Sequence, residues 1–146
     1  MTSDGTCKVW DCKLGDEIGT FDCKALPQDL HWSANGDLFC CLTKDKMGRF
    51  FDPRESRVVA EWMPHDGTKC SKMTWIGQSH RVVTTGFNRG SQREWKMWDL
   101  RNLRKPICSD SLDMVGLTEI LLILGIRYNS TILRPRYGNP LSGRKG

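Results

Sequence analysis

The sequence lacks the features that mark membrane-spanning and secreted proteins. Its longest apolar run, Ile120 to Ile126, is far shorter than the roughly 20 residues that a membrane-spanning helix needs. The N-terminus has no apolar segment of the kind found in secretory signals. These absences predict a soluble, cytosolic protein.

The sequence also lacks the spacing of a metal site or a disulfide framework. It has seven cysteines, an odd number, and no Cys-x-x-Cys pair. Such a pattern favours free thiols in a reducing compartment. Cys40 and Cys41 are adjacent, so in a strand they point to opposite faces, and the three histidines are scattered. We therefore expect no metal and no cofactor.

Signatures of catalysis and of nucleic-acid binding are missing as well. There is no phosphate-binding glycine loop, nucleophile elbow or evident carboxylate pair. Ser79-His80 and His65-Asp66 are isolated pairs of adjacent residues in turn-like segments. The positive charge is concentrated in residues 115–146, which leaves the first 114 residues close to neutral. These observations predict neither an enzyme nor a nucleic-acid-binding protein.

What the sequence does contain is a four-residue phrase that occurs three times, at Lys8–Asp11, Arg49–Asp52 and Lys96–Asp99. Each copy reads basic, apolar, aromatic, Asp, and the aspartates lie 41 and 47 residues apart. A period of roughly 40–45 residues ending in Trp-Asp is typical of a β-propeller blade. The 146 residues suffice for about three blades, whereas closed propellers have four to eight.

The unequal spacing indicates an insertion in the third copy. Thr43 lies nine residues before Asp52, whereas the matching Thr84 lies 15 residues before Asp99. We therefore expect six extra residues in a loop near 87–93. The expected strands are 6–10, 17–21, 30–32, 38–43, 47–51, 57–62, 71–75, 81–85, 95–98 and 106–109.

The predicted fold is all-β, a propeller fragment of about two and a half four-stranded antiparallel blades. Residues 1–23 are expected to form the second half of a blade, and 24–63 and 64–113 one complete blade each. Residues 114–146 contain no Trp or Cys and form an atypical basic tail, which we expect to be partly disordered. Within it, periodicity does not decide between a strand and a short helix at Leu121–Leu124.

The stretch from about residue 40 to 104 resembles two consecutive blades of a coronin propeller, and the likeness to WD-repeat proteins extends over 1–113. The residues that carry it are Asp45-Lys46, Asp52-Pro53-Arg54, His65 with Gly67, and Thr84-Thr85-Gly86-Phe87 before a polar insertion. Trp75 with Gly77, and Phe87-Asn88, look closer to the long coronins with two tandem propellers.

The resemblance implies the middle blades of a seven-bladed propeller. It also implies binding to filamentous actin and a role in actin turnover or membrane traffic, in the cytoplasm at the actin cytoskeleton, with Golgi or vesicle association as a further location. Two other hypotheses stay open. The chain could be a general WD-repeat scaffold without actin binding, or a truncated product with no independent function, since its unpaired strand edges invite aggregation.

The phrases and their neighbours supply the structural anchors that we expect between blades: Trp10, Asp11, Phe51, Asp52, His65, Thr84, Trp98 and Asp99. In WD-repeat blades a His, a Ser or Thr, a turn Asp and the Trp form one buried network. His65, Thr84 or Thr85, and Trp98 supply three members, but Gln92 stands where the turn Asp belongs. The sequence therefore predicts an incomplete network with a structural role.

Basic loop residues are the candidates for partner binding, because propeller loops gather on the faces of the disc and positive charge there attracts acidic surfaces. The alternative interpretation of each is scattered solubilising charge. The candidates are Lys44, Lys46, Arg54, Arg57, Arg89, Arg93 and Arg101.

Overall fold

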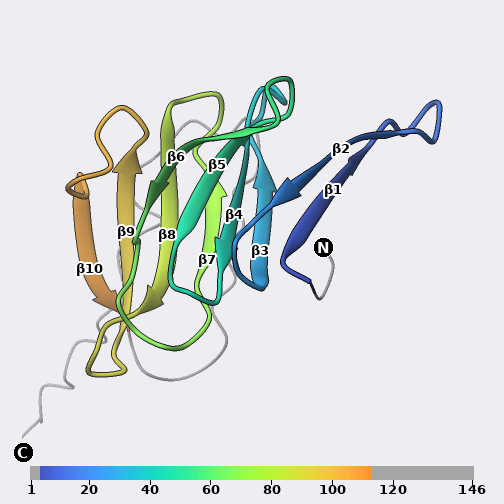
Figure 1. The fold of residues 1–146 in the computed structure, drawn as a ribbon. Coiled ribbons are helices and arrows are strands. Elements are labelled where there is room, and N and C mark those ends of the chain that lie inside the picture. The colour runs from blue at the N-terminus through green and yellow to red at the C-terminus, as the bar shows by residue number, and fades with distance from the viewer. Residues whose placement is uncertain (1–3, 113–146) are drawn as a thin grey trace, which may run out of the picture.

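The computed structural model describes residues 4–112, and in them every regular element is a β-strand (Figure 1). The ten strands are β1 (Thr6–Trp10), β2 (Glu17–Asp22), β3 (Pro27–Trp32), β4 (Phe39–Thr43), β5 (Gly48–Asp52), β6 (Arg57–Trp62), β7 (Lys72–Trp75), β8 (Arg81–Phe87), β9 (Arg93–Asp99) and β10 (Cys108–Leu112).

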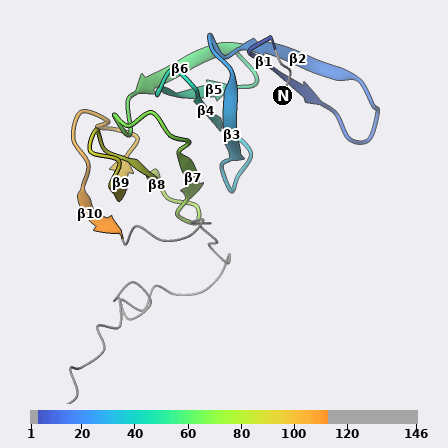
Figure 2. The ribbon, with the colours of Figure 1, turned by 90° about the horizontal axis from the view of Figure 1, so that it is seen from below.

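The strands form three antiparallel sheets in which each strand pairs with its neighbours in the sequence. The first sheet is β1-β2, the middle sheet is β3-β4-β5-β6 and the third sheet is β7-β8-β9-β10. They stand side by side with their faces packed together (Figures 1 and 2). Two four-stranded sheets and one two-stranded sheet confirm the predicted fold class of about two and a half blades. The blade boundaries assigned from the sequence remain an interpretation.

The middle sheet is buried on both faces because a sheet lies on either side of it. All five residues of β4 are buried. Successive side chains of a strand point to opposite faces, so Phe39 and Cys41 pack toward the first sheet, while Cys40 and Leu42 pack toward the third. This arrangement divides the core into two clusters, one at each junction between sheets.

The pairing register corrects the equivalence that the sequence predicted between Thr43 and Thr84. Phe39 pairs with Phe51, and Val82 pairs with Trp98. With the phrases superimposed, Thr84 is therefore equivalent to Cys41, and Thr43 is equivalent to Gly86. Gly86 lies 13 residues before Asp99, against nine from Thr43 to Asp52, so the later hairpin is four residues longer rather than six.

The extra length extends the two strands of that hairpin as well as its loop. β8 continues to Phe87 and β9 begins at Arg93, two residues beyond each predicted end. β10 begins at Cys108 rather than Pro106, because proline has no backbone N–H to pair. The described residues contain no helix long and apolar enough to cross a membrane. The predicted tail, 114–146, and its apolar segment at Leu121–Leu124 lie outside the described residues.

Candidate functional site

The aromatic residue of the phrase occupies two different environments. Phe51 is 1% exposed and Trp98 is 4% exposed, each packed between two sheets. Trp10 is 53% exposed, contrary to the expectation that it packs between blades. Among the described residues, Trp10 belongs to neither of the core clusters that form between sheets, so this side chain stays half exposed.

The aspartate of the phrase holds the turn that follows it. A carboxylate oxygen accepts the backbone N–H two residues further on in all three copies: from Lys13 to Asp11 at 2.7 Å, from Arg54 to Asp52 at 2.9 Å and from Arg101 to Asp99 at 3.0 Å. Asp side chains favour such turns because they mimic a backbone acceptor. The repeat of this residue is therefore explained by turn formation.

His65 is at the centre of a complete buried network in the third sheet. Its Nε2 lies 2.9 Å from Thr84 Oγ1, which also accepts the indole N–H of Trp98 at 3.0 Å. Its Nδ1 lies 2.8 Å from a carboxylate oxygen of Glu94. The expectation of an incomplete network is wrong, because Glu94 on β9 takes the place of the missing turn aspartate.

The charges around His65 follow from its burial. Burial lowers the pKa of His65, so the imidazole is neutral at physiological pH. Burial alone would raise the pKa of Glu94, but hydrogen bonds from Lys96 and His65 outweigh it and lower the pKa. The hydroxyl beside the imidazole belongs to Thr84, which is fully buried and accepts the indole N–H of Trp98, so this hydroxyl is enclosed within the core.

Arg49 forms a second polar centre, which the sequence did not reveal. The residue is 4% exposed, and its Nη1 donates to the carbonyl of Cys23 at 2.9 Å and to Thr43 Oγ1 at 2.7 Å. Its Nη2 lies 2.6 Å from Asp45. Burial would raise the pKa of Asp45, but the hydrogen bond from Arg49 lowers it. The repeated phrase does not mark Arg49 as buried, because its burial depends on the residues that pack around it in the fold.

The basic residue of the phrase also joins one sheet to the sheet before it. Arg49 on the middle sheet reaches the carbonyl of Cys23, just after β2. Lys96 on the third sheet donates to the carbonyl of Pro64, just after β6, at 3.1 Å. Between the inner strands, Asp29 accepts the backbone N–H of Met73 at 2.9 Å. Sheet-to-sheet contacts are thus partly polar and specific in register.

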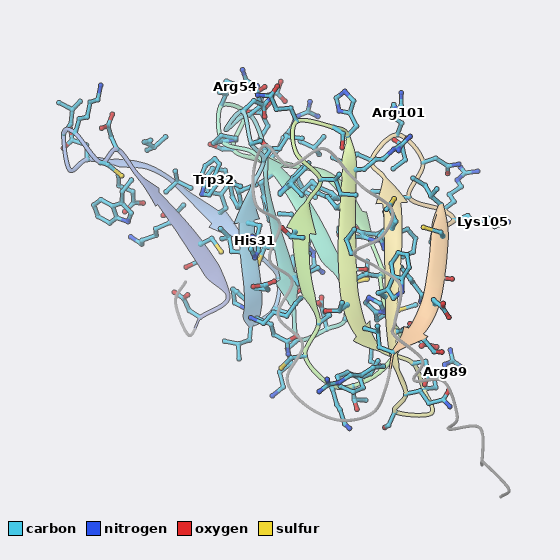
Figure 3. The ribbon with its side chains drawn as sticks, turned by 180° about the vertical axis from the view of Figure 1, so that it is seen from behind. His31, Trp32, Arg54, Arg89, Arg101 and Lys105 are labelled. Atoms are coloured by element: carbon cyan, nitrogen blue, oxygen red, sulfur yellow. The ribbon has the colours of Figure 1, made fainter. Side chains whose placement is uncertain are left out.

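The candidate partner-binding residues separate onto two ends of the molecule (Figure 3). The Arg101 end consists of the loops 11–16, 33–38, 53–56, 76–80 and 100–107, and the Arg89 end consists of the loops 23–26, 44–47, 63–71 and 88–92. Arg54, Arg57 and Arg101 lie at the Arg101 end; Lys44, Lys46, Arg89 and Arg93 lie at the Arg89 end.

At the Arg101 end each candidate arginine is paired with an acid of its own turn. Arg54 Nε lies 3.2 Å from Asp52, and Arg101 Nη2 lies 2.6 Å from Asp99. Arg57 pairs with Glu55. These arginines are neutralised locally, which matches the interpretation of solubilising charge.

The Arg89 end presents its positive charge around an aromatic ring. Arg93 and Lys69 both lie over the ring of Phe87, at 5.4 Å and 4.7 Å from its centroid. These residues, with Lys72, line a pocket of about 240 Å³. Arg89 is 85% exposed and contacts Asp66 at 2.8 Å. Lys46 donates to the carbonyl of Asp66 at 2.9 Å, and Lys44 is exposed.

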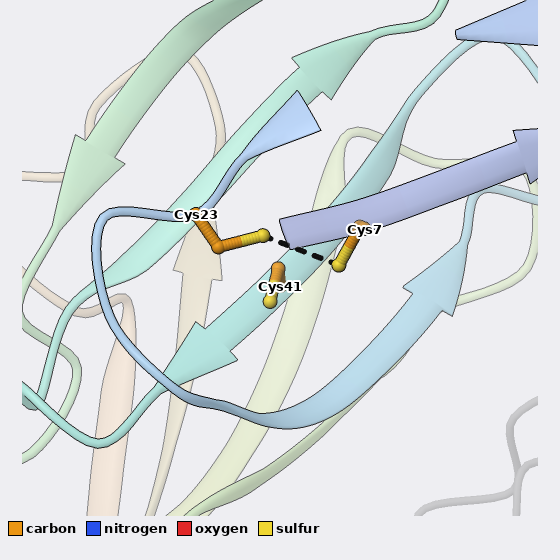
Figure 4. Close-up of side chains that lie close together, drawn as sticks. All are labelled: Cys7, Cys23 and Cys41. Atoms are coloured by element: carbon orange, nitrogen blue, oxygen red, sulfur yellow. Dashed lines mark hydrogen bonds between the residues drawn. The ribbon is translucent and has the colours of Figure 1, made fainter. Parts of the chain in front are cut away.

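Three cysteines meet at the junction of the first and middle sheets (Figure 4). The Sγ atoms of Cys7, Cys23 and Cys41 all lie within 4.8 Å of one another, and each residue is at most 1% exposed. Cys40 packs in the other core cluster, as the alternation of strand side chains predicts. The sequence concealed this cluster because its members come from three separate segments with no short spacing.

Known proteins resemble the chain over most of the described residues. The coronin-like protein crn1 of Schizosaccharomyces pombe is 33% identical over 106 residues, which cover 73% of this chain and 18% of that protein. Coronin-7 of Homo sapiens is 34% identical over 122 residues, covering 77% of this chain and 13% of that protein. No protein-family model matches.

A solved structure agrees with these sequences. The crystal structure of the WD40 domain of coronin from Toxoplasma gondii matches with a TM-score of 0.74 and 34% identity, over 78% of this chain and 30% of that chain. The chain spans only 18% of crn1 and 13% of human coronin-7. The fold, the repeated phrase and these similarities place the chain in the coronin family of WD-repeat proteins.

Proposed function

We propose that this chain supplies middle blades of a coronin-type propeller and acts as a non-enzymatic protein-interaction module that binds filamentous actin. The observation that carries the proposal is the Arg89 end, where Lys69 and Arg93 lie over one aromatic ring and Arg89 is exposed beside Asp66. We further propose that the module works in the cytoplasm, at the actin cytoskeleton or in membrane traffic. The similarity to coronins supports both statements.

The Arg89 end suits an acidic protein surface better than the Arg101 end does. At the Arg101 end, Arg54 and Arg101 already have an acidic partner two residues away. At the Arg89 end, Lys69 and Arg93 gather positive charge over the ring of Phe87. Complementary charge of this kind steers encounter and fixes orientation.

Co-sedimentation of the full chain with filamentous actin tests the proposal. We expect binding that weakens as salt rises, because exposed charges are screened. Reversing two charges at the Arg89 end, Arg89→Glu with Arg93→Glu, should abolish binding. The matched control reverses two charges at the opposite end, Arg54→Glu with Arg101→Glu, and should retain it.

Three outcomes would contradict the proposal. Equal loss in both double variants would mean that net charge, rather than this end, drives binding. Absence of co-sedimentation at any salt, by a chain with β-sheet circular dichroism and a cooperative melt, would favour a WD-repeat scaffold without actin binding. A chain without a cooperative transition would support the hypothesis of a product with no independent function.

A further inference from the structure

The three-cysteine cluster has the geometry of a ligand set. Cys23 Sγ donates to Cys7 Sγ at 3.2 Å, and no pair of the three sulfurs is further apart than 4.8 Å. Three sulfurs bound to one ion at about 2.3 Å would lie ~4.0 Å apart, within this range. We propose that Cys7, Cys23 and Cys41 bind a soft monovalent metal ion, copper(I), between the first and middle sheets.

The surroundings select the metal. Phe21, Phe39 and Phe51 belong to the same core cluster as the three cysteines. Among the described residues, no His, Asp or Glu side chain joins the three sulfurs. Structural zinc sites need four ligands, and the described residues offer three sulfurs here. Copper(I) favours soft thiolate ligands and accepts three-coordinate geometry.

A positively charged side chain, Arg49, lies beside the cluster, where it is also ion-paired with Asp45. Each thiol that binds as thiolate releases a proton to solvent, so the cluster becomes negative. Buried charge is costly unless it is paired. Arg49 pairs with Cys41 in the β4–β5 ladder and donates to the carbonyl of Cys23.

A copper(I) titration in the presence of a coloured copper(I) chelator, without oxygen, tests the site. The protein is the full chain with its exposed cysteines replaced, Cys12→Ser, Cys70→Ser and Cys108→Ser, so that only the four buried cysteines remain. We expect one copper(I) ion per chain, a higher melting temperature and an affinity that rises with pH.

Substitutions within the buried cysteines separate the cluster from its neighbour. Cys41→Ser and Cys7→Ser should each lower copper(I) affinity at least a hundredfold. Cys40→Ser is the matched control, because Cys40 is equally buried on the same strand but faces the other junction, and it should leave affinity unchanged. Circular dichroism checks that each variant folds.

Copper X-ray absorption on the loaded chain needs no variant in the cluster and should show a shell of three sulfurs. Failure to retain copper(I), an equal loss with Cys40→Ser, or a shell of nitrogen and oxygen would overturn the proposal. One-to-one zinc(II) binding at higher affinity would also overturn it. So would a Cys7–Cys23 disulfide that forms under a mild peroxide while copper(I) does not bind, because the cluster would then be a redox pair.

Discussion

The two junctions between sheets bury the same repeated phrase with different residues. The first junction is made of phenylalanine and cysteine, and the second contains three tryptophans. The first comprises Cys7, Phe21, Cys23, Phe39, Cys41 and Phe51; the second comprises Cys40, Leu42, Phe50, Trp62, Met73, Trp75, Val82 and Trp98. The phrase thus fixes where a junction forms but not which side chains fill it.

The difference shows that the aromatic residue at a junction decides which residues can stand at several neighbouring positions. The side chain of Phe51 has no N–H to donate. The position equivalent to Thr84 can therefore hold Cys41, which accepts no hydrogen bond from this side chain. Trp98 has an indole N–H and needs an acceptor, which Thr84 provides. Thr84 in turn bonds to His65, whose ring leaves space only for a glycine at position 86. One aromatic exchange therefore changes the requirements at three other positions.

The largest effect is expected from removing the aromatic residue of the second junction. Trp98→Ala should cost about 3–5 kcal/mol in unfolding free energy and sharply reduce soluble yield, because it leaves a cavity between two sheets. Urea denaturation followed by circular dichroism measures the cost. Trp98→Phe, which copies the first junction, should cost only about 1 kcal/mol, since it removes the N–H but keeps a ring. Unchanged stability of Trp98→Ala would mean that the side chain is not packed there.

Arg49 distinguishes the polar centres of the two junctions. Arg49→Met should cost about 2–3 kcal/mol, because it leaves the carbonyl of Cys23 and the carboxylate of Asp45 without their donor. Lys96→Met, at the equivalent position of the third sheet, should cost about 1 kcal/mol, since Lys96 is more exposed and makes fewer bonds. An equal loss of unfolding free energy in Arg49→Met and Lys96→Met would mean that the two polar centres stabilise their junctions to the same extent.

A methyl group at Gly86 tests the space that the histidine requires. An added Cβ would lie 2.4 Å from His65 Cγ, so Gly86→Ala should cost about 1–3 kcal/mol through overpacking. Gly90→Ala is the control, because its added Cβ meets only the Asn88 side chain at 3.3 Å. Thermal melting compares the two. A stable Gly86→Ala protein would show that His65 can move aside at little cost.

The second junction should also respond to pH more than the first between pH 5 and 6.5. Burial lowers the pKa of His65 in the folded state, so the unfolded chain binds a proton that the folded chain does not. Stability is therefore fully present above the unfolded value, about 6.5, and falls as pH falls below it. Melting temperatures in this window should depend less on pH in His65→Gln. An identical slope of melting temperature against pH in His65→Gln would mean that other groups cause the pH dependence.

The smallest effect is expected at the first copy of the phrase. Trp10→Ala should change unfolding free energy by less than about 1 kcal/mol, because the side chain is half exposed and outside both core clusters. Chemical denaturation beside Trp98→Ala provides the comparison. A cost close to that of Trp98→Ala would mean that a further surface covers Trp10 in solution.

The repeated phrase was sufficient to predict the sheets, since its period and turn residues are local signals. β1 and β6 have the predicted bounds, and the other strands differ by a few residues at their ends. The equivalence of Thr43 and Thr84 failed because sequence spacing assumes one insertion, whereas the hydrogen-bonded register places Cys41 level with Thr84.

Contacts between segments far apart in the sequence could not be predicted in the same way. Glu94 completes the His65 network across a separation of 29 residues, and it replaces an aspartate expected two residues earlier, at Gln92. Cys7, Cys23 and Cys41 come together only because two sheets pack face to face. The split of the basic residues between two ends likewise depends on strand direction rather than on composition.

The bonds from Arg49 to Cys23 and from Lys96 to Pro64 have a consequence for synthesis on the ribosome. Each joins a later strand to a carbonyl that has already been made, so the first and middle sheets each gain a bond from the sheet that follows. During translation the first sheet waits for β5 and the middle sheet waits for β9. We therefore expect a vectorial order of folding, in which a nascent chain that stops after β6 exchanges its amide hydrogens faster in the middle sheet than the finished protein does.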